Sequence, residues 1–380
     1  MIPLAIPNLS GNEARYLAEC VESNFVSSVG PFVERFETLV AESSGAPNAV
    51  ATCSGTTGLH VALVALGVGR DDLVILPSLT FIASANAIAH CGAAPWLIDV
   101  CEASWTLDPK LVERALEKET ERRGDAIIHR ESGRRVAAIM PVYTLGMPAD
   151  MDPIIATARR YQLPVVADAA AALGAEYRGR RIADLGADLS VFSFNGNKTV
   201  TAGGGGAVAG DDVQLCQRVK HLSTTARAGE DYDHDAIGFN YRMTNIQAAV
   251  GCAQLERLDD LVAAKRRIAE VYNDALAALP GVRAFPAPSW ARSACWFSGV
   301  LLERSEAADA VSAMRELGIG CRPFWKPIHL QRPYADAPHG GVGVCEEIYR
   351  KILTLPCSTN LTSEEQEEVV SNLRDWILGA

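Results

Sequence analysis

The strongest constraint on the fold is a repeated alternation of short apolar runs and amphipathic segments between residues 48 and 221. The apolar runs are typical of buried strands, and the segments between them carry apolar residues at helical spacing. Strands that alternate with helices are expected to run parallel, because a parallel pair needs a long crossover connection. The pattern therefore predicts an α/β domain with a mostly parallel seven-stranded sheet, whose ligands bind beyond the carboxyl ends of the strands.

The elements of this alternating part can be placed from the sequence. Strands are predicted at 49–52, 73–76, 95–99, 136–140, 164–167, 189–194 and 207–209. Helices are predicted at 58–66, 83–90, 109–121, 154–161 and 213–221. A polar stretch at 126–136 resembles a hairpin that turns at Ser132 and Gly133 and leaves the main sheet.

The region before the sheet carries two amphipathic helical patterns within residues 11–44. A polar loop that includes Ser27 and Ser28 separates them. This loop is either a plain linker or a place for a ligand.

The repeated pattern stops after Met243. One long helical pattern runs from there to about residue 279, where Pro280 and Gly281 end it. The remainder lacks the alternation and fits a smaller α+β domain. We therefore predict a large domain over residues 1–250 and a small C-terminal domain over 251–380, joined by the long helix.

Charge and cysteine usage exclude several classes of protein. Thirty-five basic and forty-six acidic residues give a net charge of −11, which argues against a nucleic-acid or anionic-membrane surface. The first residues do not resemble a signal peptide, and no apolar run reaches membrane-spanning length. The ten cysteines include no C-x-x-C pair. We expect a cytoplasmic protein that binds small ligands, with no metal site.

Lys198 stands where backbone can approach a ligand closely. It follows the apolar run 191–194 and precedes a run of four glycines that begins at Gly203. Glycine has no Cβ to obstruct a ligand, and a lysine beside apolar residues loses its proton more readily than a solvated one. Lys198 is therefore a candidate nucleophile toward a carbonyl group. The alternative is a solvated loop lysine.

Two more features stand where strands of the sheet end. Gly55, Thr56 and Thr57 follow the first strand and open a helix, whose free N–H groups suit a phosphate. Asp168 ends a buried strand, where a carboxylate can pair with a protonated ring nitrogen. The alternatives are an ordinary helix N-cap at the first position and a metal ligand or cap at the second.

Taken together, the three features fit one ligand. Amine, carboxylate and helix N-terminus match the aldehyde, ring nitrogen and phosphate of pyridoxal 5′-phosphate (PLP). Nicotinamide is disfavoured because no Gly-x-Gly-x-x-Gly follows the first strand, and a metal because no His/Asp cluster has ligand spacing.

Five motifs carry a resemblance to a known family over nearly the whole chain. They are Ser54-Gly-Thr56, Pro77-Ser-Leu-Thr-Phe81, Asp168-Ala-Ala, Phe192-Ser-Phe-Asn-Gly-Asn-Lys198 and Gly238-Phe-Asn-Tyr-Arg-Met243. The chain resembles the DegT/DnrJ/EryC1/StrS sugar aminotransferases. The resemblance implies the aspartate-aminotransferase-like type I fold of PLP enzymes and a homodimer with shared active sites.

The resemblance also implies roles for single residues. Lys198 would bind the cofactor covalently and Asp168 would pair with its ring nitrogen. Phe81 would lie on the ring face, although composition alone makes it a core aromatic. Asn240 would come from the partner chain, although asparagine is also an ordinary turn residue. The implied phosphate-binding residues are Gly55, Thr56, Thr57 and Ser193.

Two segments are similar to one branch of the family. The loop with Ser27 and Ser28, and the stretch 322–329, resemble the bacillosamine and legionaminic-acid branch, which aminates C4 of a UDP-linked 4-keto-6-deoxy-N-acetylhexosamine. The predicted substrate-binding residues are Ser27, Ser28, Trp325, Lys326 and His329. A tryptophan that packs between domains and a solvated lysine are the alternatives for Trp325 and Lys326.

Two positions depart from the family pattern. Ala171 stands where Gln or Glu is usual near the ring oxygen, and Tyr143 stands where His is usual. The first departure removes a polar contact to the cofactor and leaves room for an unusual substrate.

The predicted reaction is transamination in two halves. An amino acid, by resemblance glutamate, gives its amino group to the cofactor, which passes it to the sugar ketone, with Lys198 as general base and acid. The alternatives are a PLP-dependent sugar dehydratase, disfavoured because relatives with that chemistry replace the lysine with histidine, and a non-catalytic PLP-binding sensor, disfavoured by the lack of a spare DNA-binding segment.

Overall fold

The computed structural model describes residues 1–379, and its large sheet contains seven strands in the order β1-β11-β10-β7-β6-β2-β3. Isolated parallel bridges from Ile139 to Val165 and from Val142 to Asp168 join its two halves. Only β11 runs antiparallel to its neighbours, so the mostly parallel seven-stranded sheet is confirmed. The strands are β1 (Asn48–Thr52), β2 (Leu73–Pro77), β3 (Ala94–Ile98), β6 (Arg135–Ile139), β7 (Val166–Asp168), β10 (Leu189–Ser193) and β11 (Gly206–Gly210).

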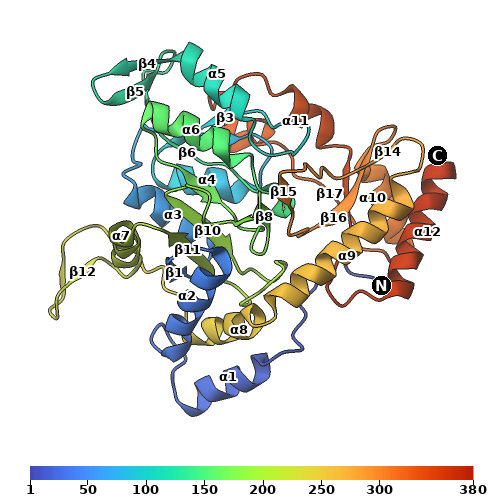
Figure 1. The fold of residues 1–380 in the computed structure, drawn as a ribbon, viewed down its shortest axis with the longest axis horizontal. Helices are drawn as coiled ribbons and strands as arrows, with labels where there is room; N and C mark the ends of the chain where they lie inside the picture. The colour runs from blue at the N-terminus through green and yellow to red at the C-terminus, as the bar shows by residue number, and fades with distance from the viewer. Residues whose placement is uncertain (380) are drawn as a thin grey trace.

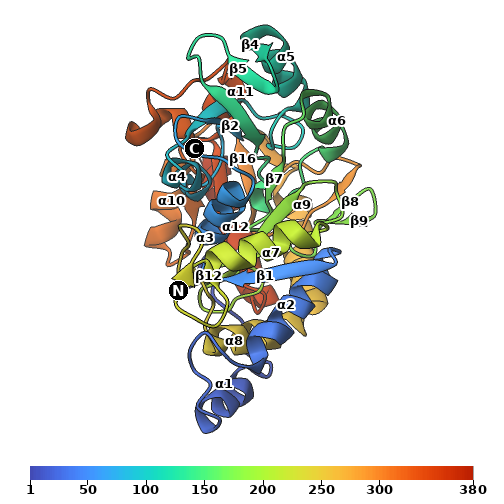
Figure 2. The ribbon, with the colours of Figure 1, turned by 90° about the vertical axis from the view of Figure 1, so that its left-hand side faces the viewer.

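Helices cover both faces of this sheet (Figures 1 and 2). Successive strand residues point to opposite faces, so Val74 packs in one apolar cluster and Ile75 in the other. The cluster with Val74 includes side chains from α3 (Gly55–Ala65), α4 (Ile82–His90) and α7 (Val213–Ser223). The cluster with Ile75 includes side chains from α2 (Pro31–Ser44), α5 (Pro109–Glu119), α6 (Met151–Tyr161) and α8 (Asn245–Leu255).

The predicted hairpin leaves the sheet as an extension of β6. β4 (Thr120–Arg123) pairs with β5 (Ala126–His129), and β5 pairs antiparallel with β6. Gly133 lies in the turn with φ +68°, a left-handed conformation that glycine adopts without a steric penalty. The turn predicted at Ser132 and Gly133 is therefore confirmed.

A second sheet lies in the C-terminal part, and all of its strand pairs are antiparallel. Its strands are β14 (Val282–Ala284), β16 (Ser298–Leu302), β17 (Arg322–Pro323) and β18 (Ile352–Leu355). The helices beside it are α9 (Leu258–Leu276), α10 (Ala307–Glu316) and α12 (Ser363–Gly379) (Figure 1). This part has the expected α+β character and a separate apolar cluster. The domain boundary near residue 250 stays a prediction.

The single long helix predicted from Met243 to residue 279 is wrong. The chain forms α8 and then α9, with a break at Glu256 and Arg257. The Glu256 carboxylate accepts hydrogen bonds from Tyr16 at 2.7 Å and Asn12 at 2.8 Å. These contacts with the N-terminal helix α1 (Glu13–Glu22) hold the break, although the sequence has no glycine or proline there.

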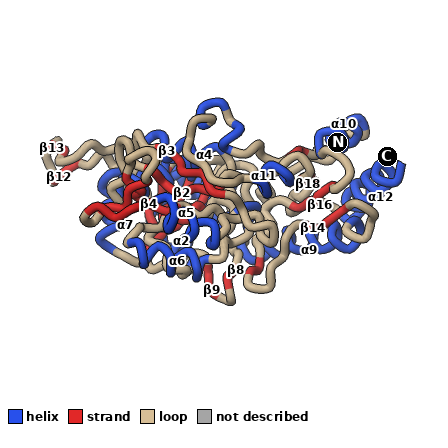
Figure 3. Tube along the Cα trace, turned by 90° about the horizontal axis from the view of Figure 1, so that it is seen from above, coloured by secondary structure: helices blue, strands red, loops and turns tan. Residues whose placement is uncertain are grey.

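The N-terminus packs on the C-terminal part, and both termini lie at that end of the molecule (Figure 3). Ile2 bridges to Ile319 and donates its N–H to the carbonyl of Gly318 at 2.9 Å. No helix within residues 1–379 is long and apolar enough to span a bilayer. Short elements complete the chain: η1 (Thr144–Gly146), β8 (Glu176–Tyr177), β9 (Arg180–Arg181), β12 (Arg227–Ala228), β13 (Asp233–His234), β15 (Ala291–Arg292), η2 (Ile328–Leu330), η3 (Arg332–Tyr334) and α11 (Gly343–Ile348).

Candidate active site

A cavity of about 580 Å³ lies at the carboxyl ends of β1, β2, β7 and β10. One wall comes from the large sheet and the other from the C-terminal part. The cavity brings together seven of the predicted residues, which are Gly55, Thr56, Phe81, Asp168, Ser193, Lys198 and Trp325. It therefore joins residues far apart in the sequence, as parallel strands that end at one edge require.

Asp168 is the last residue of β7 and is only 5% exposed. Ser84 donates a hydrogen bond to Oδ2 at 2.6 Å, and the Ala170 N–H donates to Oδ1 at 3.1 Å. Burial raises the pKa of this carboxyl group, while both hydrogen bonds and the charge of Lys198 oppose that rise. The site thus holds a buried carboxylate in a fixed orientation, which suits pairing with a cation inside the cavity.

Lys198 lies in the loop after β10 and is half-buried. Burial lowers the pKa of its amine from 10.5 to about 8, against the opposing effect of the Asp168 carboxylate. Its Nζ lies 3.7 Å from the centroid of the Trp296 ring. Within residues 1–379 this amine makes no hydrogen bond. Such an amine is deprotonated more easily than a solvated lysine, and it is free to attack a carbonyl.

The N-terminus of α3 follows β1 and lies beside Ser193 at the end of β10. Within the described residues, the N–H groups of Gly55 and Thr56 have no acceptor. A Cβ on Gly55 would lie 2.9 Å from the Cβ of Ser193, so only glycine fits without a shift. Free N–H groups at the positive end of a helix dipole bind a phosphate.

Thr57 lies in the same turn but has a different place. Its hydroxyl and N–H form a capping box with Ser54, whose hydroxyl accepts the Thr57 N–H at 3.1 Å. Thr57 is outside the cavity lining. The alternative of an ordinary N-cap is therefore present at this helix start, and Ser54 forms it.

Two aromatic rings of the cavity lining come from different parts of the chain: Phe81 follows β2, and Trp325 belongs to the C-terminal part. Phe81 is 52% exposed, and its ring centroid lies 5.6 Å from that of Trp325. An exposed aromatic ring beside the amine and carboxylate suits a planar ligand better than it suits a core position.

Lys326 and His329 lie outside the cavity lining. Lys326 is exposed. His329 is buried, with Nδ1 2.6 Å from the Ser78 hydroxyl and Nε2 3.0 Å from Glu346. These bonds connect the residue after β2 with α11. Within its own chain, His329 therefore holds two elements together and does not reach the cavity.

Ser27, Ser28 and Asn240 also lie away from the cavity of their own chain. The Ser27 carbonyl accepts the Asn245 N–H at 2.6 Å, at the start of α8. Asn240 is exposed and accepts a hydrogen bond from Arg242 at 3.2 Å.

The two departures, Ala171 and Tyr143, both line the cavity. Tyr143 is buried, and within residues 1–379 its hydroxyl has no hydrogen-bond partner. Burial raises the pKa of this phenol, as does Tyr177, while Arg180 opposes them. Tyr177 and Arg180 lie outside the cavity lining, so the influence on the phenol comes from behind the wall.

Sequence reasoning missed three side chains of the site: Thr80, Ser84 and Trp296. Thr80 and Ser84 are four residues apart, their hydroxyls lie 3.0 Å apart, and the Ser84 hydroxyl donates to Asp168. Their spacing at a helix start could have indicated this chain of hydroxyl groups. No signal in the sequence indicates that Trp296 contacts Lys198.

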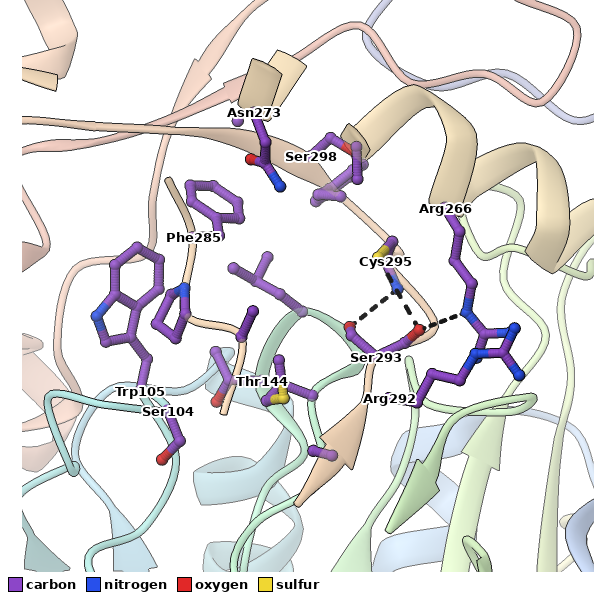
Figure 4. Close-up of a pocket in the computed structure, with 18 of the residues that line it drawn as sticks. Ser104, Trp105, Thr144, Arg266, Asn273, Phe285, Arg292, Ser293, Cys295 and Ser298 are labelled. Atoms are coloured by element: carbon purple, nitrogen blue, oxygen red, sulfur yellow. Dashed lines mark hydrogen bonds between the residues drawn. The ribbon is translucent and has the colours of Figure 1, made fainter. Parts of the chain in front are cut away.

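A second cavity, of about 290 Å³, lies behind the active-site wall (Figure 4). Thr144, Leu145 and Phe297 line both cavities. The guanidinium of Arg266 stands at its edge, where Nε donates to the Ser293 carbonyl at 2.9 Å. None of the predicted site residues lies in this second cavity.

Comparison with known proteins decides the family. The sequence model of the DegT/DnrJ/EryC1/StrS aminotransferase family matches residues 7–374. The chain belongs to this family. It is a PLP-dependent aminotransferase that acts on sugars. The site fits the cofactor because the Lys198 amine, the Asp168 carboxylate and the N-terminus of α3 line one cavity.

Curated relatives match along almost their whole length. The chain is 38% identical to GDP-perosamine synthase of Caulobacter vibrioides, over 98% of this chain and 97% of that protein. It is 37% identical to a Bacillus subtilis protein named as a pyridoxal phosphate-dependent aminotransferase, EpsN, over 98% of this chain and 95% of that protein.

Solved structures share the fold. S. venezuelae DesV, in complex with a ketimine intermediate, is 33% identical with a TM-score of 0.86, over 96% of this chain and 94% of that chain. The aminotransferase TlmJ of Streptoalloteichus hindustanus is 28% identical with a TM-score of 0.90, over 100% of this chain and 99% of that chain. The predicted type I PLP fold is confirmed.

Proposed function

We propose that the protein transfers an amino group from glutamate to C4 of a nucleotide-linked 4-keto-6-deoxy sugar. The observation that carries this proposal is the convergence of Lys198, Asp168 and the α3 N-terminus on one cavity. The cavity volume of about 580 Å³ is within the range of roughly 300–1,000 Å³ that small-molecule sites have.

Each residue has a distinct task. When bound, PLP supplies the electron sink that makes the donor's α-hydrogen acidic. Lys198 binds the cofactor's aldehyde, and after release its Nζ takes the proton from the donor α-carbon and returns a proton to the sugar carbon. Asp168 keeps the ring nitrogen protonated. The N–H groups of Gly55 and Thr56, with Ser193, hold the phosphate.

The nucleotide has two candidates. The loop with Ser27 and Ser28 and the stretch 322–329 favour a UDP-linked N-acetylhexosamine through their resemblance to one branch of the family. The name GDP-perosamine synthase, carried by relatives up to 38% identical, favours a GDP-linked sugar. Trp325 in the cavity wall is the candidate to pack on the sugar or base, with Lys326 near the diphosphate.

The proposed active unit is a homodimer. Ser27, Ser28 and Asn240 are surface residues of their own chain, and they serve the partner's site in this proposal. The loop that carries both serines also exposes apolar side chains, which a second copy would cover. In this loop they are Phe25, Val26 and Val29, and Val21 near the end of α1 is also exposed.

A substrate panel tests the proposal. The PLP-loaded enzyme is incubated with glutamate and with UDP-linked and GDP-linked 4-keto and 3-keto sugars, and products are identified by mass spectrometry. The proposal predicts a mass corresponding to replacement of the ketone by an amine, for 4-keto sugars only. Loss of a hydroxyl without gain of nitrogen would support a dehydratase, and no product would support a PLP-binding sensor.

A further inference from the structure

Trp296 touches the catalytic loop at two points. Its Nε1–H donates to the carbonyl of Asn197 at 2.6 Å, and the face of its ring lies 3.7 Å from the Nζ of Lys198. The backbone N–H of Trp296 donates to the carbonyl of Leu145 at 3.1 Å. Trp296 as a whole is 3% exposed. One side chain of the C-terminal part therefore holds both the lysine and the residue before it.

The position of Trp296 is fixed in turn by Lys265. This lysine lies on α9 and is 3% exposed. Its Nζ donates to the carbonyls of Trp296 at 2.9 Å and Cys357 at 2.6 Å. Within residues 1–379, no carboxylate pairs with it in a salt bridge. Burial of an ammonium is costly unless it is bonded, and the carbonyls of Trp296 and Cys357 are the acceptors that bond this one.

We propose that Trp296, held by the buried ammonium of Lys265, is a positioning residue that sets where the Lys198 amine stands. This inference rests on the proposed role of Lys198, but not on the identity of the sugar. A lysine stem has four rotatable bonds, and Lys198 has no hydrogen bond to restrict it within residues 1–379. The indole face is therefore the contact that limits the amine.

The same arrangement connects the two parts of the chain. Cys295 and Ser298 lie on either side of Trp296 in the sequence, and both line the second cavity (Figure 4). Trp296 lies just before β16, whose neighbour β18 ends two residues before Cys357. Lys265 binds both of these backbone segments, so the C-terminal sheet and α9 together determine the geometry at the catalytic amine.

The test measures the amine directly, without turnover. Cofactor-free protein is mixed with PLP, and covalent capture is followed by absorbance. Trp296→Leu is expected to slow capture roughly tenfold, because a misplaced amine loses near-attack geometry. Trp296→Phe keeps an aromatic face and should stay within about threefold of wild type. Trp376→Leu, on α12 and away from the cavity, is the matched control and should capture PLP at the wild-type rate.

Lys265→Met tests the second half of the inference. It is expected to slow capture in the same direction as Trp296→Leu. In turnover, both variants should lower kcat and leave the KM for the sugar unchanged, because the indole orients the amine and not the substrate. If Lys265→Met fails to fold, the two Trp296 variants still decide the role of the indole.

Two outcomes would overturn the proposal. Capture by Trp296→Leu at the wild-type rate would remove the role of the indole, and wild-type capture by folded Lys265→Met would remove that of the ammonium. Lys198→Ala separates this failure from failure of the proposed function. If Lys198→Ala still captures PLP covalently, the catalytic assignment is wrong; if it does not, while Trp296→Leu is normal, only the positioning role falls.

Discussion

Two lysines of this protein, the buried Lys265 and the half-buried Lys198, have different surroundings. Lys265 donates to two carbonyls, whereas Lys198 has no hydrogen-bond acceptor within residues 1–379 and faces an indole and a carboxylate. The pKa of Lys198 is lowered to about 8 by burial. The comparison teaches that burial alone does not make a lysine reactive: a nucleophile also needs to be left without hydrogen-bond acceptors.

Replacement of each lysine in turn should give the largest difference in transamination rate. Lys198→Ala is expected to lower transamination roughly ten-thousandfold or more, because the group that moves the proton is lost. Lys265→Met should retain turnover at roughly a tenth of wild type, since only positioning is affected. Amino-sugar formation by mass spectrometry measures both, with circular dichroism to show that each variant is folded. Equal losses in the two variants would contradict the comparison.

Asp168→Asn tests the carboxylate that faces Lys198. The side chain keeps its shape and can still accept from Ser84, but it cannot hold a positive ring nitrogen. We expect kcat to fall roughly hundredfold with PLP still bound. Single-turnover absorbance changes on addition of glutamate report this step. An unchanged rate would show that the carboxylate does not serve the cofactor.

The pH dependence of PLP capture sharpens the contrast in reactivity. Capture by the cofactor-free protein needs the neutral amine, so its rate should rise with pH and level off above about pH 8 instead of near 10.5. The pKa of Lys198 is about 8 in the folded protein and 10.5 in the unfolded chain, so between these pH values the unfolded state binds more protons. The free energy of unfolding should therefore increase with pH in this range. Urea titrations of wild type and Lys198→Met should differ in this slope. A capture rate still rising at pH 10 would contradict the low pKa.

The stability effect of Lys265 is the smallest of these predictions. Lys265→Met leaves the carbonyls of Trp296 and Cys357 without their charged donor, and we expect a loss of about 1–3 kcal/mol in the free energy of unfolding. Urea denaturation of the cofactor-free protein measures it, with Lys198→Met as the matched variant that should lose nothing. Greater stability in Lys265→Met would show that the cost of desolvating the Lys265 ammonium exceeds the stabilisation from its two hydrogen bonds.

The sequence predicted the parts of the fold that depend on local patterns. Short apolar runs such as 73–76, which alternate with amphipathic helical patterns, placed the strands and the parallel sheet. In the structure, Val74 and Ile75 of this run pack in the two apolar clusters on opposite faces. The break between α8 and α9 was missed because Glu256 is held by Asn12 and Tyr16, more than 200 residues away in the chain. A contact of that kind leaves no periodic signal.

The active-site residues also fall into two groups, those that local patterns predict and those that only tertiary packing places. Gly55 and Asp168 lie at or just after strand ends, and Lys198 follows in the loop after β10, so the topology of a parallel sheet brings them together. Trp296 reaches Asn197 across a separation of 99 residues from a segment with no motif of its own. Lys265 appears in the sequence as one charged residue of an amphipathic helix. Only the packing of α9 against β16 shows that it is buried.

The central claim is that the amine of Lys198 bonds to PLP. The most direct measurement is reduction of the PLP-loaded protein with borohydride, which fixes the lysine–cofactor bond, followed by proteolysis and mass spectrometry of the peptides. The account predicts that the reduced cofactor is found on the peptide that contains Lys198 and is absent from the peptide that contains Lys265. Cofactor mass on any other lysine, with Lys198 unmodified, would contradict it.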